Sequence, residues 1–126
     1  REGRSLARDL AKRLNEMQSQ IKIIQRRSSI ILNEKKKFLN AEEFSSFQKN
    51  SDVHEELARL EHYIDEFRFL FKSRNAVGKK MDFVAQEMQR ETNTIGSKLQ
   101  DKVVANSVIA LKSKIEKIRE QSQNIE

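Results

Sequence analysis

Apolar residues recur at alternating spacings of four and three in four segments of the chain, and this repeat constrains the fold more than any other feature. The first segment carries Leu10, Leu14, Met17, Ile21, Ile24 and Ile31. Similar stripes follow within residues 53–71, 81–95 and 104–125. A stripe of this period is typical of an amphipathic helix that buries one face against other helices. Because Pro is absent and Gly numbers only 3, little opposes long helices, and the sequence predicts an all-α fold.

The first two stripes predict a pair of long helices. The first helix is expected to run through roughly residue 32, which spans about 45 Å and requires a partner of similar length. The second is expected to begin at Asn40, an N-cap with Glu43 in the capping-box position. It should continue to about Lys72, with an interruption near Asn50.

The second half of the chain predicts a turn and two more helices. The turn is expected at residues 73–78. A third helix should start at about residue 79 and weaken or end at residues 93–97, and the last helix should begin near Asp101. The expected architecture is an elongated bundle of about four helices with a long antiparallel helical hairpin.

Several kinds of functional site are missing from the sequence. Cys is absent, which excludes disulfides and thiolate metal sites. No apolar run approaches the roughly 20 residues of a membrane span. The phosphate-loop pattern GxxxxGK[ST], the dinucleotide pattern GxGxxG and the zinc pattern HExxH are also missing. Chemistry in this chain would therefore depend on carboxylates, His and Arg, and metal-assisted phosphodiester hydrolysis fits such groups.

The net charge of +6 is distributed unevenly along the chain. Residues 1–40 contain 11 basic and 4 acidic side chains, residues 41–76 contain 5 and 8, and residues 77–126 contain 9 and 7. The basic first helix could pair with the acidic second helix inside the bundle. It could equally form an electrostatic footprint for nucleic acid, because Lys and Arg contacts to phosphate release counterions.

The expected second helix carries a polar arc opposite its apolar stripe. The arc contains Asp52, Glu55, Glu56, Arg59, His62, Tyr63 and Glu66. Carboxylates and a histidine at spacings of three, four and seven could hold a divalent metal ion. They could also form ordinary surface ion pairs between residues three or four apart. The spacing alone favours the surface ion pairs, and the metal site is the alternative.

The third and fourth helices carry polar arcs of their own. The third helix presents Asp82, Gln86, Arg90, Asn93 and Ser97 within an arc of roughly 80°. The fourth presents Lys112, Glu116, Arg119 and Gln123 beside its apolar stripe. Amide, carboxylate and guanidinium groups of fixed geometry suit bidentate contact with phosphate, a base edge or a buried carboxylate. A polar seam between two helices is the alternative.

Three segments together resemble one protein family. They are SDVHEELARLEHYIDEF (51–67), GKKMDFVAQEMQRETNTIGSK (78–98) and LKSKIEKIREQSQNIE (111–126). In this order they resemble the C-terminal domain of the YicC/YloC family of bacterial endoribonucleases. The likeness covers about three quarters of the chain, and residues 34–50 resemble the family only loosely.

The resemblance implies a function and a setting for the chain. It implies a bacterial cytoplasmic enzyme that cleaves RNA internally, assisted by a divalent cation such as Mn²⁺ or Mg²⁺. It further implies a homo-oligomer, a hexamer in the full-length protein. Residues 1–126 would be the C-terminal helical domain of a larger protein whose N-terminal half is absent from this chain, so the fragment alone is expected to be inactive.

The motif positions and the polar arcs together give the candidate site residues. The catalytic candidates are Glu55, Glu56, His62, Glu87 and Arg90. The candidates for RNA contact are Arg59, Gln86, Asn93, Lys98, Lys112 and Arg119. The candidate metal ligands are Asp52, Glu55 and Glu56. The competing hypothesis is a non-catalytic helical module that oligomerises or binds RNA, with the chemistry in the absent half.

Overall fold

A computed structural model of the chain describes residues 2–73 and 78–123, and nearly all of them are helical. The helices are α1 (Glu2–Phe38), α2 (Ala41–Asn50), α3 (His54–Ser73), α4 (Gly78–Lys98) and α5 (Lys102–Gln123). The described part contains no strand. The predicted all-α class is therefore confirmed. None of the described helices is long and apolar enough to cross a membrane.

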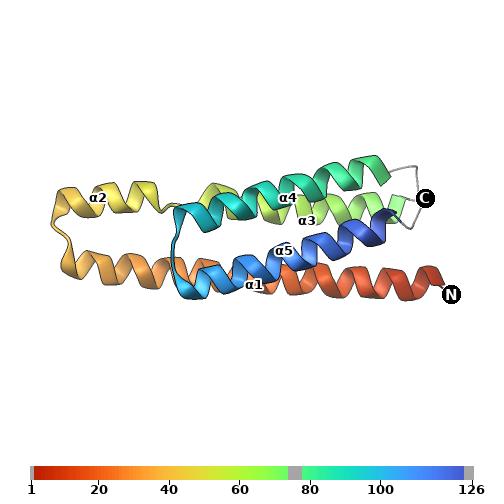
Figure 1. Ribbon diagram of the computed structural model, residues 1–126, viewed down its shortest axis with the longest axis horizontal. Coiled ribbons are helices and arrows are strands. Elements are labelled where there is room, and N and C mark those ends of the chain that lie inside the picture. Colours follow the sequence, from red (N-terminus) through yellow and green to blue (C-terminus); the bar gives the residue numbers. More distant parts are fainter. Residues whose placement is uncertain (1, 74–77, 124–126) are drawn as a thin grey trace.

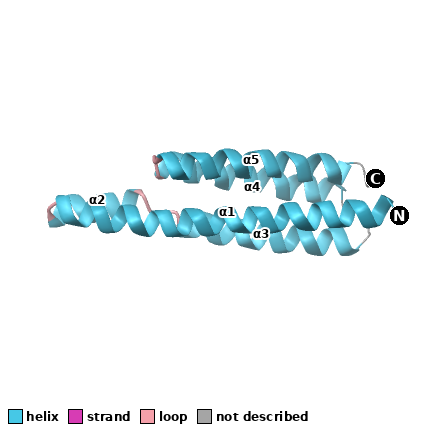
Figure 2. Ribbon diagram, turned by 90° about the horizontal axis from the view of Figure 1, so that it is seen from below, coloured by secondary structure: helices cyan, strands magenta, loops and turns pink. Residues whose placement is uncertain are grey.

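The helices form an elongated antiparallel bundle. Figure 1 shows that α2 and α3 follow one another along α1 in the reverse direction, and that α4 and α5 form a second antiparallel pair. In the bundle α3 packs against α4, α4 against α5, and α5 against α1. Beyond the turn between α4 and α5, the end of α1 and all of α2 continue as a projecting hairpin (Figures 1 and 2). This arrangement confirms the predicted long hairpin.

The apolar stripes form the core, as the repeat predicts. From each of the four bundle helices, most residues of the stripe are buried in one cluster, and Phe71 and Val108 pack against it partly buried. The largest side chains with less than 2% exposure include Leu14, Met17, Leu60, Phe67, Met88 and Ile115. Burying side chains of this size contributes roughly 1.5–3 kcal/mol each before the entropic cost of ordering the chain. The core therefore explains why four amphipathic helices associate side by side.

The hairpin is closed by the cap that the sequence predicts. The Asn40 side chain accepts a hydrogen bond from the Glu43 backbone N–H at 2.8 Å, and the Glu43 carboxylate accepts one from the Asn40 N–H at 3.0 Å. This reciprocal capping box satisfies backbone donors that the first turn of a helix leaves without partners. No residue of α2 is buried, so the hairpin tip depends on local interactions of this kind.

Two helix ends lie beyond those expected, and the predicted interruption near Asn50 is confirmed. Helix α1 runs to Phe38, beyond residue 32, because Glu34 and the following lysines favour helix and no Gly or Pro interrupts them. The expected second helix is two helices, α2 and α3, separated at residues 51–53 near the predicted interruption. Helix α4 does not end at residues 93–97 but continues to Lys98, with Ile95 fully buried. The predicted turn falls largely on residues 74–77, which lie outside the described part.

Candidate functional site

Two buried carboxylates lie between α3 and α4, at the edge of the core. Glu56 is only 4% exposed and Glu91 only 5% exposed. Each meets a cation from the opposite helix, Lys98 for Glu56 and Arg59 for Glu91. We call these four residues, with the flanking Glu55, the α3–α4 seam. Burial of a charged group is costly unless it is paired, so the two cations are integral to the packing of these helices.

Arg59 holds the centre of the seam. Its Nε donates a hydrogen bond to Glu91 Oε2 at 3.0 Å. Its Nη1 lies 3.6 Å from Glu55 Oε2, and its Nη2 lies 4.0 Å from Glu56 Oε2. The hydrogen bond and charge of Glu91, followed by the charges of Glu55 and Glu56, raise the pKa of Arg59 above its ordinary value. The guanidinium is thus fixed in orientation and remains partly exposed beside three carboxylates.

Lys98 closes one end of the seam. Its Nζ donates to Glu56 Oε2 at 2.9 Å and to the Asp52 carbonyl oxygen at 3.3 Å. The hydrogen bond to Glu56 raises the pKa of Lys98. The second oxygen of Glu56, Oε1, is buried and has no hydrogen-bond partner among the described residues. One carboxylate at this end therefore has an acceptor that the described residues do not satisfy.

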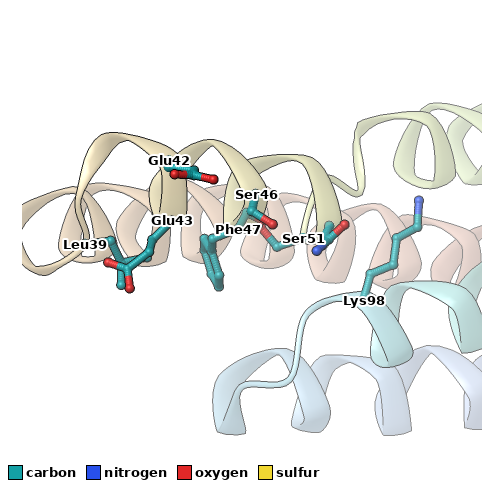
Figure 3. Close-up of a pocket in the computed structure, with 8 residues that line it drawn as sticks. Leu39, Glu42, Glu43, Ser46, Phe47, Ser51 and Lys98 are labelled. Atoms are coloured by element: carbon teal, nitrogen blue, oxygen red, sulfur yellow. Dashed lines mark hydrogen bonds between the residues drawn. The ribbon is translucent and has the colours of Figure 1, made fainter.

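An open hollow adjoins Lys98 at the base of the projecting hairpin. Figure 3 shows Lys98 reaching from the end of α4 toward α2 and the segment that follows it. The hollow is lined by Leu39, Glu42, Glu43, Ser46, Phe47, Asn50, Ser51 and Lys98. Leu39 and Phe47 are its apolar lining residues, and Lys35 Nζ lies 5.4 Å from the centre of the Phe47 ring. The hollow places an ammonium group between apolar and carboxylate side chains but contains no catalytic arrangement of its own.

A second polar contact joins α4 to α5. Arg119 Nε donates to Asp82 Oδ1 at 2.5 Å, and Gln86 Nε2 donates to Asp82 Oδ2 at 2.9 Å. The hydrogen bond and charge of Asp82 raise the pKa of Arg119. Two predicted RNA-contacting residues, Gln86 and Arg119, therefore meet at one carboxylate. This contact lies on the opposite flank of α4 from the seam, because Asp82 faces α5 and Glu91 faces α3.

Other predicted site residues do not converge with the seam. Arg90 is 72% exposed and its nearest carboxylate partner, at 2.8 Å, is Glu87 on the same helix. His62 is 73% exposed and lies 3.8 Å from Glu66, one turn further along α3. Asn93 and Lys112 are exposed side chains. The polar arc of α4 therefore mostly faces solvent and does not turn as a whole toward its neighbours.

The predicted metal ligands do not form a metal site within this chain. Among residues 2–73 and 78–123, no three His, Asp or Glu side chains are placed to share one ion. The Asp52 carboxylate accepts the His54 backbone N–H at 3.0 Å, Glu55 is 82% exposed, and Glu56 is held by Lys98. The three carboxylates thus have separate partners, and the divalent cation stays a prediction.

Glu91 is the seam residue that the sequence candidates omit. It lies seven residues after Val84 and three after Met88, at a position where the stripe of α4 would place an apolar side chain. A carboxylate at such a position is the available signal, because it must find a partner when buried. That signal does not identify the partner, since Arg59 is on another helix.

The chain matches a known protein family over nearly its whole length. Residues 6–126 match the profile of the family described as "Endoribonuclease YicC-like, C-terminal". The chain belongs to the YicC-like C-terminal family. The match includes all the seam residues and both flanks of α4. The resemblance drawn from the three sequence segments is thereby confirmed.

Two curated relatives support the assignment to the YicC-like family. The chain is 36% identical to the "Probable endoribonuclease YicC" of Clostridioides difficile (strain 630), over 99% of this chain and 49% of that protein. It is 45% identical over 75 residues to the "Probable endoribonuclease YicC" of Haemophilus influenzae (strain ATCC 51907 / DSM 11121 / KW20 / Rd), which covers 60% of this chain and 26% of that protein. The chain therefore spans about half the length of the first relative.

Proposed function

We propose that this chain is the C-terminal helical domain of an endoribonuclease and that it contributes part of the site that hydrolyses RNA phosphodiester bonds. The proposal is supported by family membership and by two relatives that carry the name probable endoribonuclease. Since the first of them is about twice as long as this chain, we further propose that an N-terminal half completes the enzyme.

The observation that carries the proposal is the seam with its two oriented cations. A guanidinium fixed by a buried carboxylate can stabilise negative charge that develops on phosphoryl oxygens, because it needs no reorientation during the reaction. Arg59 meets this requirement, and its remaining donors are partly exposed. Lys98 supplies a second positive charge next to the same pair of helices.

Glu55 is the seam carboxylate best placed to transfer a proton. It is 82% exposed and lies 3.6 Å from the Arg59 guanidinium, whereas Glu56 and Glu91 are buried and hold cations. In the proposed reaction Glu55 accepts a proton from the attacking oxygen or donates one to the leaving oxygen. Glu56 orients Lys98 in this scheme, which differs from the direct catalytic role expected from the sequence.

Polar residues of the neighbouring surfaces, most of them exposed and Glu87 and Arg119 half-buried, are proposed to contact the RNA. On α4 and α5 these are Gln86, Glu87, Arg90, Asn93, Lys112 and Arg119, and on α3 His62. A homo-oligomer, hexameric in the full-length protein, would bring such surfaces from several subunits together. The cytoplasm is the proposed location, and a divalent cation stays a prediction without an assigned step, because the described carboxylates of one chain do not fit it.

The second candidate function is a non-catalytic helical module that oligomerises or binds RNA. One observation favours it: the described carboxylates either pair with cations in the packing or face solvent separately. No three described carboxylate or histidine side chains are placed around one ion. In that case the chemistry would reside in the N-terminal half.

Substitution in the full-length protein distinguishes the two functions. We would measure cleavage of end-labelled structured and single-stranded RNA by Arg59→Gln and Glu55→Gln, with Mn²⁺, with Mg²⁺ and with chelator. Asp65→Asn is the matched control, because Asp65 is an exposed carboxylate on α3 that lies beside Arg68. The enzyme proposal expects large losses of cleavage in the first two variants, with unchanged circular dichroism and oligomer size. Full cleavage by both variants would assign the chemistry elsewhere and favour the module.

A further inference from the structure

The outward face of α1 carries a long polar stripe without an acidic residue. Positions at alternating spacings of four and three, from residue 8 to residue 36, are all exposed, and so is the adjoining residue 37. The stripe contains Arg8, Lys12, Asn15, Ser19, Lys22, Arg26, Ser29, Asn33, Lys36 and Lys37. We call this surface the α1 basic stripe. At 1.5 Å per residue it extends for about 43 Å, and Figure 2 shows α1 following the length of the molecule into the projecting hairpin.

The charges of the α1 basic stripe repeat with a period of 14 residues. Arg8 and Lys12 recur 14 residues later as Lys22 and Arg26, and Lys36 repeats the first of the two positions once more, with Lys37 beside it. Between them lie two pairs of small hydrogen-bonding residues, Asn15 with Ser19 and Ser29 with Asn33. The basic pairs are therefore about 21 Å apart along one rigid helix.

The acidic residues of α1 lie on a flank and leave the stripe uncompensated. Asp9, Glu16 and Glu34 fall roughly 80–100° around the helix from Arg8, and Glu16 lies 3.5 Å from Lys114 of α5. None of the basic residues of the stripe forms an ion pair with a described carboxylate. Like charges four residues apart repel on a helix. The stripe thus keeps mutually repelling cations that the bundle does not neutralise.

The basic first helix does not use its charge to pair with the acidic second one. Between α3 and α1, Arg68 of α3 donates hydrogen bonds to the side-chain oxygens of Asn15 and Gln18, at 2.6 and 3.1 Å. The ion pair of Arg27 is with Asp101, at the start of α5. Of the two explanations for the charge distribution, complementary pairing between these helices is therefore not realised in the described residues.

We propose that the α1 basic stripe binds the sugar–phosphate backbone of RNA, along a surface separate from the α3–α4 seam. This inference rests on the proposed function, which makes RNA the substrate. A polyanion complements a long line of cations, and each phosphate contact releases counterions. Asn and Ser side chains between the basic pairs can hydrogen-bond phosphate oxygens and ribose hydroxyls. Such contacts position the RNA without reading its sequence.

An anionic membrane surface fits the stripe less well than RNA does. A helix that lies on a membrane needs an apolar face to insert between the lipids. The apolar stripe of α1, which includes Leu14, Met17 and Ile24, is buried in the bundle core. The remaining alternative is an acidic surface on a second copy of the chain.

The test measures RNA affinity of the full-length protein as a function of salt. The stripe variant is Lys22→Gln/Arg26→Gln, and the matched control is Lys79→Gln/Lys80→Gln, which removes the same charge from exposed positions at the start of α4. Binding of a fluorescein-labelled RNA would be followed by anisotropy between 50 and 200 mM KCl. Each lost phosphate contact lowers the slope of log affinity against log salt by about 0.7–0.9.

We expect the stripe variant to bind roughly tenfold more weakly at 50 mM KCl, with a slope about 1.5 smaller in magnitude. The loss should be equal for RNAs of different sequence, and the control should bind as the wild type does. Equal affinity and slope in both variants would overturn the inference. So would a stripe variant whose oligomer dissociates in sedimentation while its affinity for RNA is unchanged, since that result assigns the stripe to a second copy.

The outcome also separates this inference from the proposed function. A wild-type protein that binds RNA through the stripe but cleaves none would refute the endoribonuclease proposal alone. A protein that cleaves RNA while the stripe variant retains the wild-type affinity and salt slope would refute the stripe alone.

Discussion

Replacing Lys98 with Met should destabilise the bundle through the carboxylate that it leaves behind. Lys98 Nζ is the hydrogen-bond donor to Glu56 Oε2, and Glu56 Oε1 already lacks a partner among the described residues. Met retains a chain of similar length but removes the ammonium. The nearest remaining cation would be Arg59, whose Nη2 lies 4.0 Å from Glu56, beyond hydrogen-bond distance.

The expected loss follows from the burial of Glu56. A buried acceptor left without a partner costs about 1–3 kcal/mol, and Glu56 is only 4% exposed, so we expect about 2 kcal/mol. A chain of 126 residues has an unfolding entropy of roughly 0.26 kcal/mol/K, so the Tm should fall by about 8 °C. Removing both partners is much less costly than removing one. The Glu56→Met/Lys98→Met variant should therefore recover most of the loss.

Urea denaturation followed by circular dichroism measures this cycle. Lys117→Met on α5 is the control, because Lys117 is exposed and forms no ion pair with a described residue. The control should unfold at the same urea concentration as the wild type, and the free energy of unfolding should fall with urea at the same slope in all variants. A Lys98→Met variant as stable as the wild type would refute the idea that Glu56 is a buried charge in need of this partner. A double variant as unstable as Lys98→Met would assign the loss to packing.

Three further predictions concern the bundle and its hairpin. The hydrogen bond from Arg27 lowers the pKa of Asp101, so this pair should stabilise the fold above the unfolded carboxyl pKa near 3.9 and lose that effect as the pH falls through the lower folded value. Asp101→Asn, which keeps a capping side chain, should be less stable than the wild type at pH 7 in thermal unfolding, and the difference should shrink as the pH falls below the unfolded carboxyl pKa. A difference that stays constant with pH would contradict the linkage. Asn40→Ala removes the capping box with Glu43 and should lower the stability of α2 by about 1 kcal/mol. Hydrogen exchange in the first turn of α2 should become faster, and unchanged exchange there would show that the capping box does not hold the hairpin tip. Leu60→Ala, at a fully buried position, should lower the free energy of unfolding measured in urea by about 3 kcal/mol. A loss below about 1 kcal/mol would mean that the neighbouring side chains fill the cavity or that Leu60 is not part of the core.

The buried faces of the helices were predictable because the apolar repeat can be recognised in the sequence of each helix separately. Met81, Met88 and Ile95 of α4 are fully buried, as their spacing indicates. The cap at Asn40 was predictable for the same reason, since both of its hydrogen bonds are local. Local patterns therefore gave the fold class, the core and the hairpin.

The flanks of the helices were not predictable because they depend on the order of packing around the bundle. Seen along α4, Asp82 and Gln89 reach α5, whereas Glu91 and Lys98 reach α3. Nothing in the sequence of α4 says which neighbour lies on which flank. A single polar arc was therefore expected where the structure has two contact flanks and an exposed surface between them, and Glu91 was omitted from the candidates.

The seam and the α1 basic stripe hold their cations in different ways. A bundle selected for stability alone could place apolar residues at Glu56 and Glu91, because packed hydrophobic side chains commonly replace buried ion pairs without loss. The two carboxylates instead orient Lys98 and Arg59, whereas the cations of the stripe pair with no described carboxylate.

Cations that are oriented in advance suit stabilisation of charge at one phosphoryl group. Cations on flexible side chains along a rigid helix suit capture of a backbone of any sequence. Under this reasoning neutralising Arg59 should lower the rate of cleavage at saturating RNA, while neutralising Lys22 and Arg26 should raise the RNA concentration needed to reach that rate. The two surfaces thus make separable contributions to one proposed reaction, because one acts on the transition state and the other on binding.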